Sequence, residues 1–577
     1  MSDYSPPVDD IVSALRSSGL GMVCAGSSGP SAADVEGLVA EFGRFAAGVV
    51  APTDTIADQL GVRFDPSSST VSVPDEVRDA YGKYVASGWG AATLSVAHGG
   101  GGVPYLGRLA FEEMLCSANL AFSLNPMLTH GAIDLLSVWG TDDQKSRFLP
   151  KLATGEWTGT MNLTEPDAGS DVGAIRSVAT QTPGGNWLVR GTKIFVTWGE
   201  HDLTSNIIHL VLARTPGAAA GSRGISLFVV PRVLADGTRN SVWCRGVEHK
   251  LGLHGSPTCV LEYDDAVAEL VGGEGRGMAA MFTMMNSARV AVASEGVATG
   301  QRSFSAALDY ARQRQQGTAW HDPALPVAII EHPDVRRMLL DIRATTRAMR
   351  LLLFLAGSQF DISRSAPDEG ERSEAASAAA LLTPIVKSWC TDQGFRVASL
   401  AVQVHGGAGY IEETGIAQRL RDVRIAPIYE GTNGIQAVDL VTRKLLGDEG
   451  VAVASFITRI QHDVARGITG AGEAGVVWSE AMGAAVEVWK QATDWMLQPG
   501  RDRGDVLAGA TSYLEIAART LAGWRLGVHA DRVAREESHA APEALADVEF
   551  FAVEALPLVA GYLPSATAGL RRLTAAL

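Results

Sequence analysis

The chain has 577 residues, with 64 acidic and 48 basic side chains and a formal net charge of −16 at pH 7. This length predicts about three to five domains, and 46% hydrophobic with 19% charged residues is typical of a globular rather than a disordered protein. The acidic balance argues against a nucleic acid partner, and no stretch reaches the roughly eighteen uninterrupted apolar residues of a membrane span.

The five cysteines are dispersed along the chain and form no C-x-x-C pair. This pattern is typical of a reducing compartment and predicts neither a disulfide framework nor a metal site. The twelve histidines show no H-E-x-x-H spacing. The start, Met1-Ser2-Asp3-Tyr4, has no basic region followed by an apolar one, so we expect no signal peptide and a cytoplasmic protein.

Residues 1–155 are expected to form an N-terminal helical domain. Segment 61–74 shows no periodicity and is expected to be irregular, and the glycine-rich run 98–104 is interpreted as a flexible connection. Apolar residues recur at helical spacing in 8–15, 32–45, 74–85, 105–116, 122–139 and 142–152.

Residues 156–275 change to short, β-branched segments separated by glycines. Such spacing predicts a middle domain built as an antiparallel sheet or a small barrel. The expected strands are 157–163, 175–181, 187–191, 193–197, 207–214, 225–230 and 259–263.

The remaining chain is helical again, and we divide it into a C-terminal bundle (276–447) and an extra helical domain (448–577). Long helices with short connections predict bundles. The first long helix, 278–311, is expected to break at Gly296 and Gly300. The other expected helices are 333–359, 373–404, 432–446, 452–469, 478–496, 506–536 and 542–556. The fold class is therefore α+β and multidomain.

One stretch of the bundle stands out, IYEGTNGIQ at 428–436. Glu430 precedes a glycine that allows close backbone approach, and Thr432 or Asn433 is positioned to cap the following helix. A carboxylate flanked by apolar side chains on a tight turn can have a raised pKa and act as a general base. The alternative interpretation is a surface glutamate beside a helix cap.

A second group of residues suits a flavin, whose ring needs polar donors along one edge and an apolar wall. Thr164, Gly169 and Ser170 place hydroxyl groups and an open backbone in one loop, and Phe195 and Thr197 lie on one face of a strand. Each group also fits a plain alternative, because surface hydroxyls are common and Phe195 by itself is a typical core residue.

Four motifs occur in this order: TEPDAGSD (164–171), GTKIFVT (191–197), QVHGGAGY (403–410) and YEGT (429–432). Together they closely resemble the acyl-CoA dehydrogenase family. The resemblance covers about residues 75–446, and the last 130 residues resemble the extra helical domain of a longer bacterial branch. The resemblance implies helical, sheet and helical domains in that order, an FAD cofactor and an acyl-CoA substrate in fatty acid metabolism.

By this resemblance Glu430 removes the α-proton of the thioester while FAD accepts the β-hydride, giving the trans-2-enoyl-CoA. Electrons would then pass to an electron-transferring flavoprotein. The residues matched to FAD in the same subunit are Met161, Leu163, Thr164, Gly169, Ser170, Phe195, Thr197, Thr432 and Asn433. Those matched to substrate are Ser170, Arg289, Tyr429 and Gly431.

Another set of matched FAD residues, Arg314, Gln403, Gly406 and Gly407, belongs to the neighbouring subunit in the family, which implies a homo-oligomer with a dimer favoured. Arg314 matches a pyrophosphate contact, although Gly317 and Thr318 replace the usual Phe-Gly that follows it. The alternative is a solvated basic helix end. Arg289 has two equal interpretations, as an active-site group or as half of a structural ion pair.

Two other functions remain open from the sequence. Acyl-CoA and nitroalkane oxidases look similar, with oxygen as the electron acceptor. A degenerate homologue that acts as a non-catalytic binding subunit is the other possibility, and the altered residues after Arg314 leave room for it.

Overall fold

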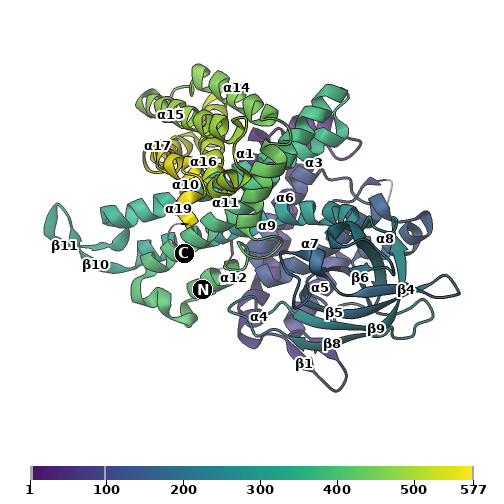
Figure 1. The fold of residues 1–577 in the computed structure, drawn as a ribbon. Helices are drawn as coiled ribbons and strands as arrows, with labels where there is room; N and C mark the ends of the chain where they lie inside the picture. Colours follow the sequence, from purple (N-terminus) through teal and green to yellow (C-terminus); the bar gives the residue numbers. More distant parts are fainter. Residues whose placement is uncertain (1–3, 97–98, 575–577) are drawn as a thin grey trace.

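The computed structural model describes residues 4–96 and 99–574, so the expectations for the chain start at Met1–Asp3 and for His98 lie outside the described residues. Figure 1 shows a helical N-terminal part, a β-rich part to one side, a central helical bundle and a final helical layer. This order confirms the expected fold class. The exact domain limits, 1–155, 156–275, 276–447 and 448–577, stay predictions.

The N-terminal part consists of helices packed around α6 and α7. Its α-helices are α1 (Val8–Ser17), α2 (Leu20–Ala25), α3 (Ala32–Phe45), α4 (Asp54–Leu60), α5 (Asp75–Ala86), α6 (Tyr105–Ala118), α7 (Leu120–Trp139) and α8 (Asp142–Thr154). Every residue of α6 is buried, as is most of α7. These two helices therefore lie in the interior and separate the N-terminal layer from the bundle.

Two segments of this part differ from expectation. The segment 61–74 is not irregular, because β1 (Arg63–Asp65) and β2 (Thr70–Ser72) pair as an antiparallel hairpin. The described glycines of the run 98–104 fold back on η3 (Trp89–Ala91) and the turn after it: Gly101 N–H donates to Ala91 O at 3.0 Å and Gly102 N–H to Leu94 O at 2.8 Å.

The middle part is a sheet that closes on itself. Its strands are β3 (Trp157–Asn162), β4 (Val178–Gln181), β5 (Trp187–Thr197), β6 (Asn206–Arg214), β7 (Ile225–Pro231), β8 (Val242–Val247) and β9 (Thr258–Val271). The pairings β4–β5–β9–β7–β6–β4 form a ring, which agrees with the small barrel. However, β6 runs parallel to both β3 and β4, so the sheet is not wholly antiparallel.

Three strand predictions in this part are also corrected. The segments 187–191 and 193–197 form one strand, β5, because Gly191 continues it at φ +150°. There a Cβ would lie 2.2 Å from Ser177 Oγ, so the close contact needs glycine. The predicted strand 259–263 is only part of β9, and β8 was not predicted.

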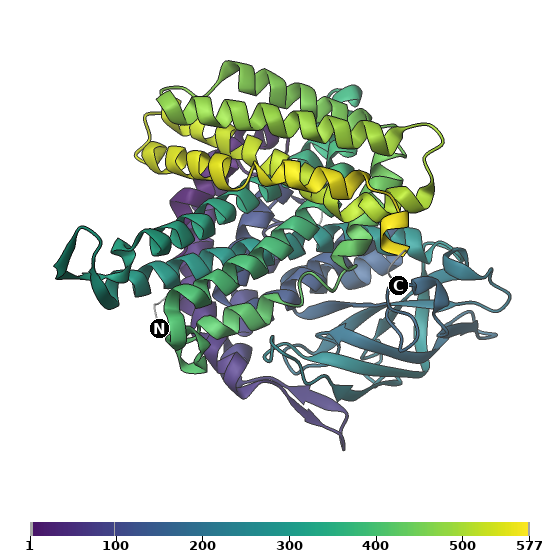
Figure 2. The same ribbon diagram turned by 60° about the vertical axis from the view of Figure 1, so that its left-hand side comes forward.

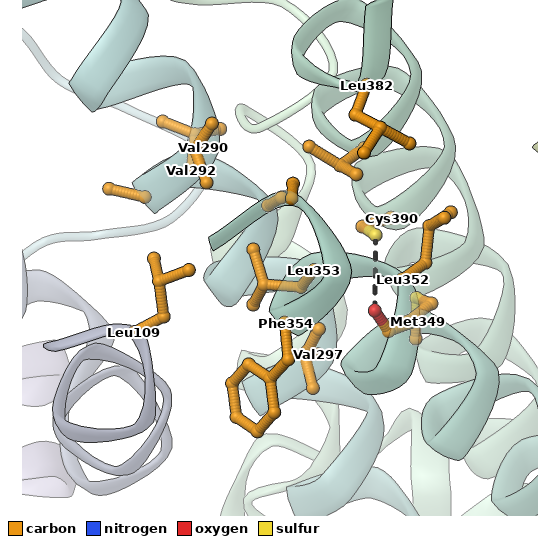
Figure 3. Packing of buried hydrophobic residues seen from close by; sticks show 14 of the residues in the cluster. Leu109, Val290, Val292, Val297, Met349, Leu352, Leu353, Phe354, Leu382 and Cys390 are labelled. Carbon is orange, nitrogen blue, oxygen red and sulfur yellow. Dashed lines mark hydrogen bonds between the residues drawn. The ribbon is translucent and has the colours of Figure 1, made fainter. Parts of the chain in front are cut away.

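The bundle is built on α9 (Gly277–Gln313), α10 (Pro333–Ser365) and α11 (Glu369–His405). The expected breaks at Gly296 and Gly300 are absent, since α9 is continuous. Gly296 instead faces α11, where a Cβ would lie 2.0 Å from Cys390 O, and Gly394 faces Gly296 in turn. Figure 3 shows the apolar side chains that fill the space around this crossing, with the Cys390 thiol directed at Met349 O.

Between α9 and α10 the chain forms a hairpin that the sequence did not indicate. Strands β10 (Gln315–Ala319) and β11 (Asp322–Ala328) pair antiparallel and are largely exposed. Both ribbon views show them projecting from the bundle on the side away from the middle sheet (Figures 1 and 2).

After α11 the chain turns through η8 (Gly406–Tyr410), η9 (Glu412–Thr414) and α12 (Ile416–Val423). The expected continuous helix 432–446 is instead α13 (Asn433–Asp439) followed by a π-helical stretch, η10 (Leu440–Leu445). Asp422 joins this region to the middle part, because its carboxylate accepts a 2.6 Å hydrogen bond from Leu253 N–H.

The extra C-terminal part lies as a layer across the bundle (Figure 2). Its helices are α14 (Val451–Arg466), α15 (Gly472–Leu497), α16 (Arg503–Arg535), α17 (Ala541–Glu554), α18 (Leu558–Thr567) and α19 (Arg571–Thr574). Asp547 of α17, fully buried, pairs with Arg343 and Arg347 of α10. Helix α16 also reaches α1, where Arg525 donates to Ser17 O at 2.6 Å and Arg532 donates to Ser13 O at 2.9 Å.

Among the described residues, no helix combines the length and the apolar content that crossing a bilayer requires.

Candidate active site

The turn that carries Glu430 is wound in an uncommon backbone conformation. Glu430 has φ +55° and Gly431 has φ +90°. A non-glycine residue at positive φ is rare and is tolerated where surrounding contacts fix it. At Gly431 a Cβ would also lie 2.6 Å from Gln436 Nε2, and the positive φ would strain any other residue there. The turn therefore presents the Glu430 side chain from a tightly held backbone.

Two buried cations hold this turn through its backbone carbonyls. Arg289 of α9 donates from Nε to Glu430 O at 3.2 Å, and Lys387 of α11 donates from Nζ to Gly431 O at 3.0 Å. Lys387 also donates to Asn433 Oδ1 at 2.8 Å. Within the described chain Arg289 forms no ion pair with a carboxylate, and its bond to Glu430 O places it against the loop. Its role as an active-site group stays a prediction.

Neither Thr432 nor Asn433, the two residues expected to cap the helix, caps it through its side chain. Thr432 occupies the position before α13, but its side chain makes no capping hydrogen bond. Asn433 is the first helical residue, and its amide donates to Ser388 O at 3.2 Å and Thr391 Oγ1 at 3.0 Å. Asn433 therefore ties the turn to α11. The role of both residues in cofactor binding stays a prediction.

Glu430 is surrounded by protein although part of its surface stays open. Burial raises the pKa of its carboxyl above the ordinary value, and Arg289 and Lys387 oppose that rise. The same burial lowers the pKa of Lys387 to about 8, against the influence of Glu430 and Glu295. A desolvated carboxylate next to open space has the properties of a general base.

Tyr429 and Glu295 form a second buried pair behind this turn. The Tyr429 hydroxyl donates to Glu295 Oε1, while Glu295 Oε2 has no partner among the described residues. Burial raises the pKa of Glu295 to about 8, although the Tyr429 hydrogen bond opposes that rise. The Tyr429 hydroxyl thus points to α9, and a substrate contact would have to involve another part of the ring.

Sequence reasoning missed both Glu295 and Lys387. Each is a single charge within a long apolar stretch of helix, and each is fully buried. An isolated charge at such a position is a usable signal, because burial of a charge is costly without a partner.

The loop 164–170 is anchored by Glu165. Its carboxylate pairs with the buried Lys193 Nζ at 2.7 Å and accepts the backbone N–H groups of Arg176 at 2.6 Å and Ser177 at 3.1 Å. Lys193 also donates to Leu163 O at 3.0 Å, and Ile194 N–H donates to Thr164 O at 2.9 Å. The loop is therefore fixed to β5, with Gly169 and Ser170 exposed.

Beside this loop, β5 turns Phe195 outward. The register of β5 against β9 shifts between Lys193 and Val196, and Phe195 has φ +57°. Its ring is 58% exposed, which is unusual for a large aromatic residue on a barrel strand. Thr197 is half-buried two residues along the same strand, and Met161 and Leu163 are half-buried at the end of β3.

These features fit a flat, polar-edged ring such as that of a flavin. An outward aromatic ring supplies a wall, exposed Ser170 and half-buried Thr164 and Thr197 supply hydroxyl groups, and a Cβ at Gly169 would meet nothing within 4 Å. The bulge that turns Phe195 outward is of a kind that is common at barrel rims and next to active sites.

The remaining predicted cofactor residues lie elsewhere in the chain. Arg314 ends α9 beside the β10–β11 hairpin, and Gln403, Gly406 and Gly407 are exposed at the end of α11. Tyr310 and His405 stack with ring centroids 4.5 Å apart and so join the two segments. Figure 1 places this end of the bundle opposite the middle sheet, so one chain does not bring both sets of residues together.

A cavity lies between α6, α7 and α9. It is lined by aromatic side chains of the N-terminal part and by Cys116, Met127 and Ala291. Glu295 follows Ala291 by one helical turn, and together with burial it raises the pKa of the Cys116 thiol well above its usual range. The cavity therefore lies on the side of α9 that also carries Glu295, and none of the residues that line it belongs to the Glu430 turn.

The fold and the two sites together define an FAD-dependent oxidoreductase. Family models agree for each part: acyl-CoA dehydrogenase N-terminal domain at 36–156, middle domain at 160–266 and C-terminal domain at 275–446, and acetyl-CoA dehydrogenase C-terminal like at 456–576. The chain belongs to the acyl-CoA dehydrogenase family, with an extra C-terminal domain, and is an FAD-dependent enzyme.

Individual proteins support the same assignment. The 3-methylmercaptopropionyl-CoA dehydrogenase of Ruegeria pomeroyi is 45% identical over 507 residues, which cover 86% of this chain and 85% of that protein. ACDH-11 of Caenorhabditis elegans, solved with C11-CoA, superposes with a TM-score of 0.80 at 22% identity and covers 100% of this chain and 95% of that one. An acyl-CoA dehydrogenase of Bacillus anthracis complexed with FAD gives 0.75 at 20% identity, covering 94% and 90%. The two structural likenesses show the fold alone.

Proposed function

We propose that this enzyme removes the α-proton and the β-hydride of an acyl-CoA thioester, with Glu430 as the base, and releases the trans-2-enoyl-CoA. The observation that supports this most is the Glu430 turn: a desolvated carboxylate on a rigid backbone, without an ion-pair partner in the described chain. Such a carboxylate is basic enough to accept a carbon-bound proton near neutral pH.

The residues proposed to hold FAD in the same chain are those along β3, the 164–170 loop and β5, with Phe195 as the wall beside the ring. When bound, FAD supplies an acceptor for the β-hydride. The Glu165–Lys193 pair keeps the loop in place for that contact. Tyr429 and Gly431 would line the acyl group, and Ser170 would lie near the CoA arm.

In the reaction, Glu430 takes the α-proton, and its position is kept by the bonds from Arg289 and Lys387 to the turn. Binding of the acyl group against the Glu430 turn would exclude water there, which strengthens the electrostatic contacts. Arg289 acts on the loop and is a positioning residue in this scheme.

A second chain is proposed to complete the cofactor site. Arg314, Gln403, Gly406 and Gly407 are exposed at the end of the bundle that lies away from the middle sheet, which is the arrangement expected if they serve a neighbouring copy. A guanidinium fork suits a pyrophosphate. A dimer is therefore part of the proposal, and an electron-transferring flavoprotein is the proposed acceptor.

The test is Glu430→Gln, which keeps the size of the side chain and removes the base. We expect the variant to keep FAD while the rate of anaerobic flavin bleaching by acyl-CoA falls at least about a thousandfold. Substantial bleaching by the variant would contradict the assignment. Oxygen uptake by the wild type during turnover would point to an oxidase, and a protein that binds no FAD would point to a non-catalytic homologue.

A further inference from the structure

The β10–β11 hairpin projects from the bundle on the side away from the middle sheet (Figures 1 and 2). Among the described strands, β10 and β11 pair only with each other. Within residues 315–328 only Ala319 is buried. A two-stranded hairpin is at best marginally stable by itself in water and is normally supported by a surface that it packs against. The described part of this chain does not supply such a surface for most of the hairpin.

The base of the hairpin is nevertheless firmly attached to the bundle. Ile329 N–H donates to Arg314 O at 2.8 Å, where the two strands begin and end. His332 Nε2 lies 2.7 Å from Gln316 O, and because a carbonyl only accepts, the ring donates this hydrogen bond. Residues 315–328 therefore form an arm that leaves the bundle in a fixed direction.

The side chains of the arm are those of a contact surface. Trp320 at its tip is 78% exposed, and Leu325 on the opposite strand is 48% exposed. His321 and Asp322 are the only ionisable residues of the arm. Exposed strands normally carry charges, lysine above all, that prevent association with other chains. An arm with an exposed tryptophan and almost no charge has the composition of a surface that another protein covers.

Two prolines limit how a partner can bind the arm. Pro323 and Pro326 both lie in β11. Proline has no N–H to donate, so β11 is a poor template for a further strand. The partner is therefore expected to contact the side chains of Trp320 and Leu325 rather than to extend the sheet.

The place where the arm begins identifies the partner. Arg314 leads directly into β10 and is one of the residues proposed to serve the FAD of a second copy. The stack of Tyr310 on His405 joins this segment to the end of α11, where the other residues of that group lie. A contact that brings Arg314 to a second copy also brings the arm to it, because the two are adjacent in the chain.

The charge of the molecule agrees with this choice. Each copy has a formal net charge of −16, so two copies repel each other at long range. An almost uncharged arm with an aromatic tip can make contact without adding to that repulsion.

We propose that the β10–β11 hairpin is an oligomerisation arm, in which Trp320 and Leu325 pack against a second copy of this chain and so hold Arg314 at the FAD site of that copy. A two-fold interface is self-complementary, so each copy gives one arm and receives one. The inference rests on the second-chain part of the proposed function and adds the contact that joins the two copies.

The first test measures self-association of the full-length, FAD-loaded enzyme by sedimentation velocity over a range of concentrations. In the double variant Trp320→Ser with Leu325→Ser, we expect the dissociation constant of the dimer to rise at least about tenfold, because both substitutions remove apolar contact area. The fraction of FAD retained on dilution should fall in parallel. Val553→Ser, which changes a 56% exposed apolar residue of α17, is the matched control and should alter neither quantity.

The second test locates the partner of the arm directly. The photoreactive residue p-benzoylphenylalanine replaces Trp320, and illumination should give a covalent dimer. Mixing copies labelled with ¹⁵N and unlabelled copies shows by mass spectrometry whether the crosslinked peptides come from different chains. The same photoreactive residue in place of Val553 should give no covalent dimer.

The results separate this inference from the proposed function. A wild-type dimer whose dissociation constant is unchanged in the double variant overturns the arm and leaves the second-chain FAD site standing. Crosslinks from position 320 only within one chain do the same, as does a double variant that stays dimeric and loses only electron transfer to an electron-transferring flavoprotein. A wild-type enzyme that is an FAD-loaded monomer removes the second-chain part of the proposed function as well, while flavin bleaching by acyl-CoA still tests its chemistry.

Discussion

Two loop glutamates of this enzyme, Glu165 and Glu430, each lie near a buried lysine, yet their carboxyl groups behave in opposite ways. Lys193 donates a hydrogen bond to the Glu165 carboxylate itself. Burial raises the pKa of Glu165, but Lys193 and two backbone N–H groups outweigh that effect, so the pKa is lowered overall. Lys387 gives its bonds to Gly431 O and Asn433, and burial then raises the pKa of Glu430.

The difference shows that the nearest cation does not by itself decide the role of a buried carboxylate. What matters is which atom receives the hydrogen bond of that cation. A lysine bound to the carboxylate makes a structural pair, whereas a lysine bound to the neighbouring carbonyl fixes the backbone and leaves the carboxylate free to accept a proton.

The largest expected effect tests the structural role of the Glu165–Lys193 ion pair. Glu165→Leu leaves Lys193 buried without a counter-charge, so the free energy of unfolding should fall by about 3–5 kcal/mol in denaturant titrations. The matched variant Glu430→Gln should change it by less than about 1 kcal/mol, because no ion pair is lost. Equal losses in the two variants would break the comparison. Adding Lys193→Met to Glu165→Leu should recover part of the stability.

The next effect concerns the pH dependence of the reaction. Lys387→Met removes a positive charge that opposes the raised pKa of Glu430, so this pKa should rise further. The acidic limb of the kcat profile should then move upward by about one pH unit, since the base must be ionised to act. Lys387→Arg keeps the charge and should leave the limb in place. A downward shift in Lys387→Met would contradict the assignment.

The smallest expected effect concerns the pH dependence of protein stability that the buried Tyr429–Glu295 pair causes. Burial raises the pKa of Glu295 from 4.5 to about 8, so its proton stabilises the fold fully below pH 4.5 and this contribution is lost as pH rises through 8. This contribution to the thermal stability of the wild type should therefore decline between about pH 5 and 8 and level off above pH 8. Glu295→Gln, which keeps the size of the side chain, should flatten that decline by about 1 kcal/mol. Parallel profiles would show that Glu295 does not titrate in this range.

Much of the fold could be predicted because its helices and strands follow their local apolar periodicity. The order of helical and sheet domains was clear, and the motif around Glu430 stood out since its carboxylate, glycine and helix start are adjacent in sequence. The β10–β11 hairpin could not be found in this way, because its strands are exposed on both faces and show no alternation. The continuity of α9 was missed because Gly296 serves a helix crossing that only tertiary packing reveals.

The site was predictable to a similar extent. The residues of the turn and of the proposed flavin edge come from short motifs, but Glu295 and Lys387 are brought to the turn only by helices that meet in the folded chain.

The contact of α16 with α1 has a consequence for how the chain is made. Ser13 and Ser17 leave the ribosome early, whereas Arg525 and Arg532, which bind them, are synthesised hundreds of residues later. The first helix therefore cannot reach its final setting during most of translation. Completion of the native contacts must wait until the C-terminal layer has emerged and settled on the bundle.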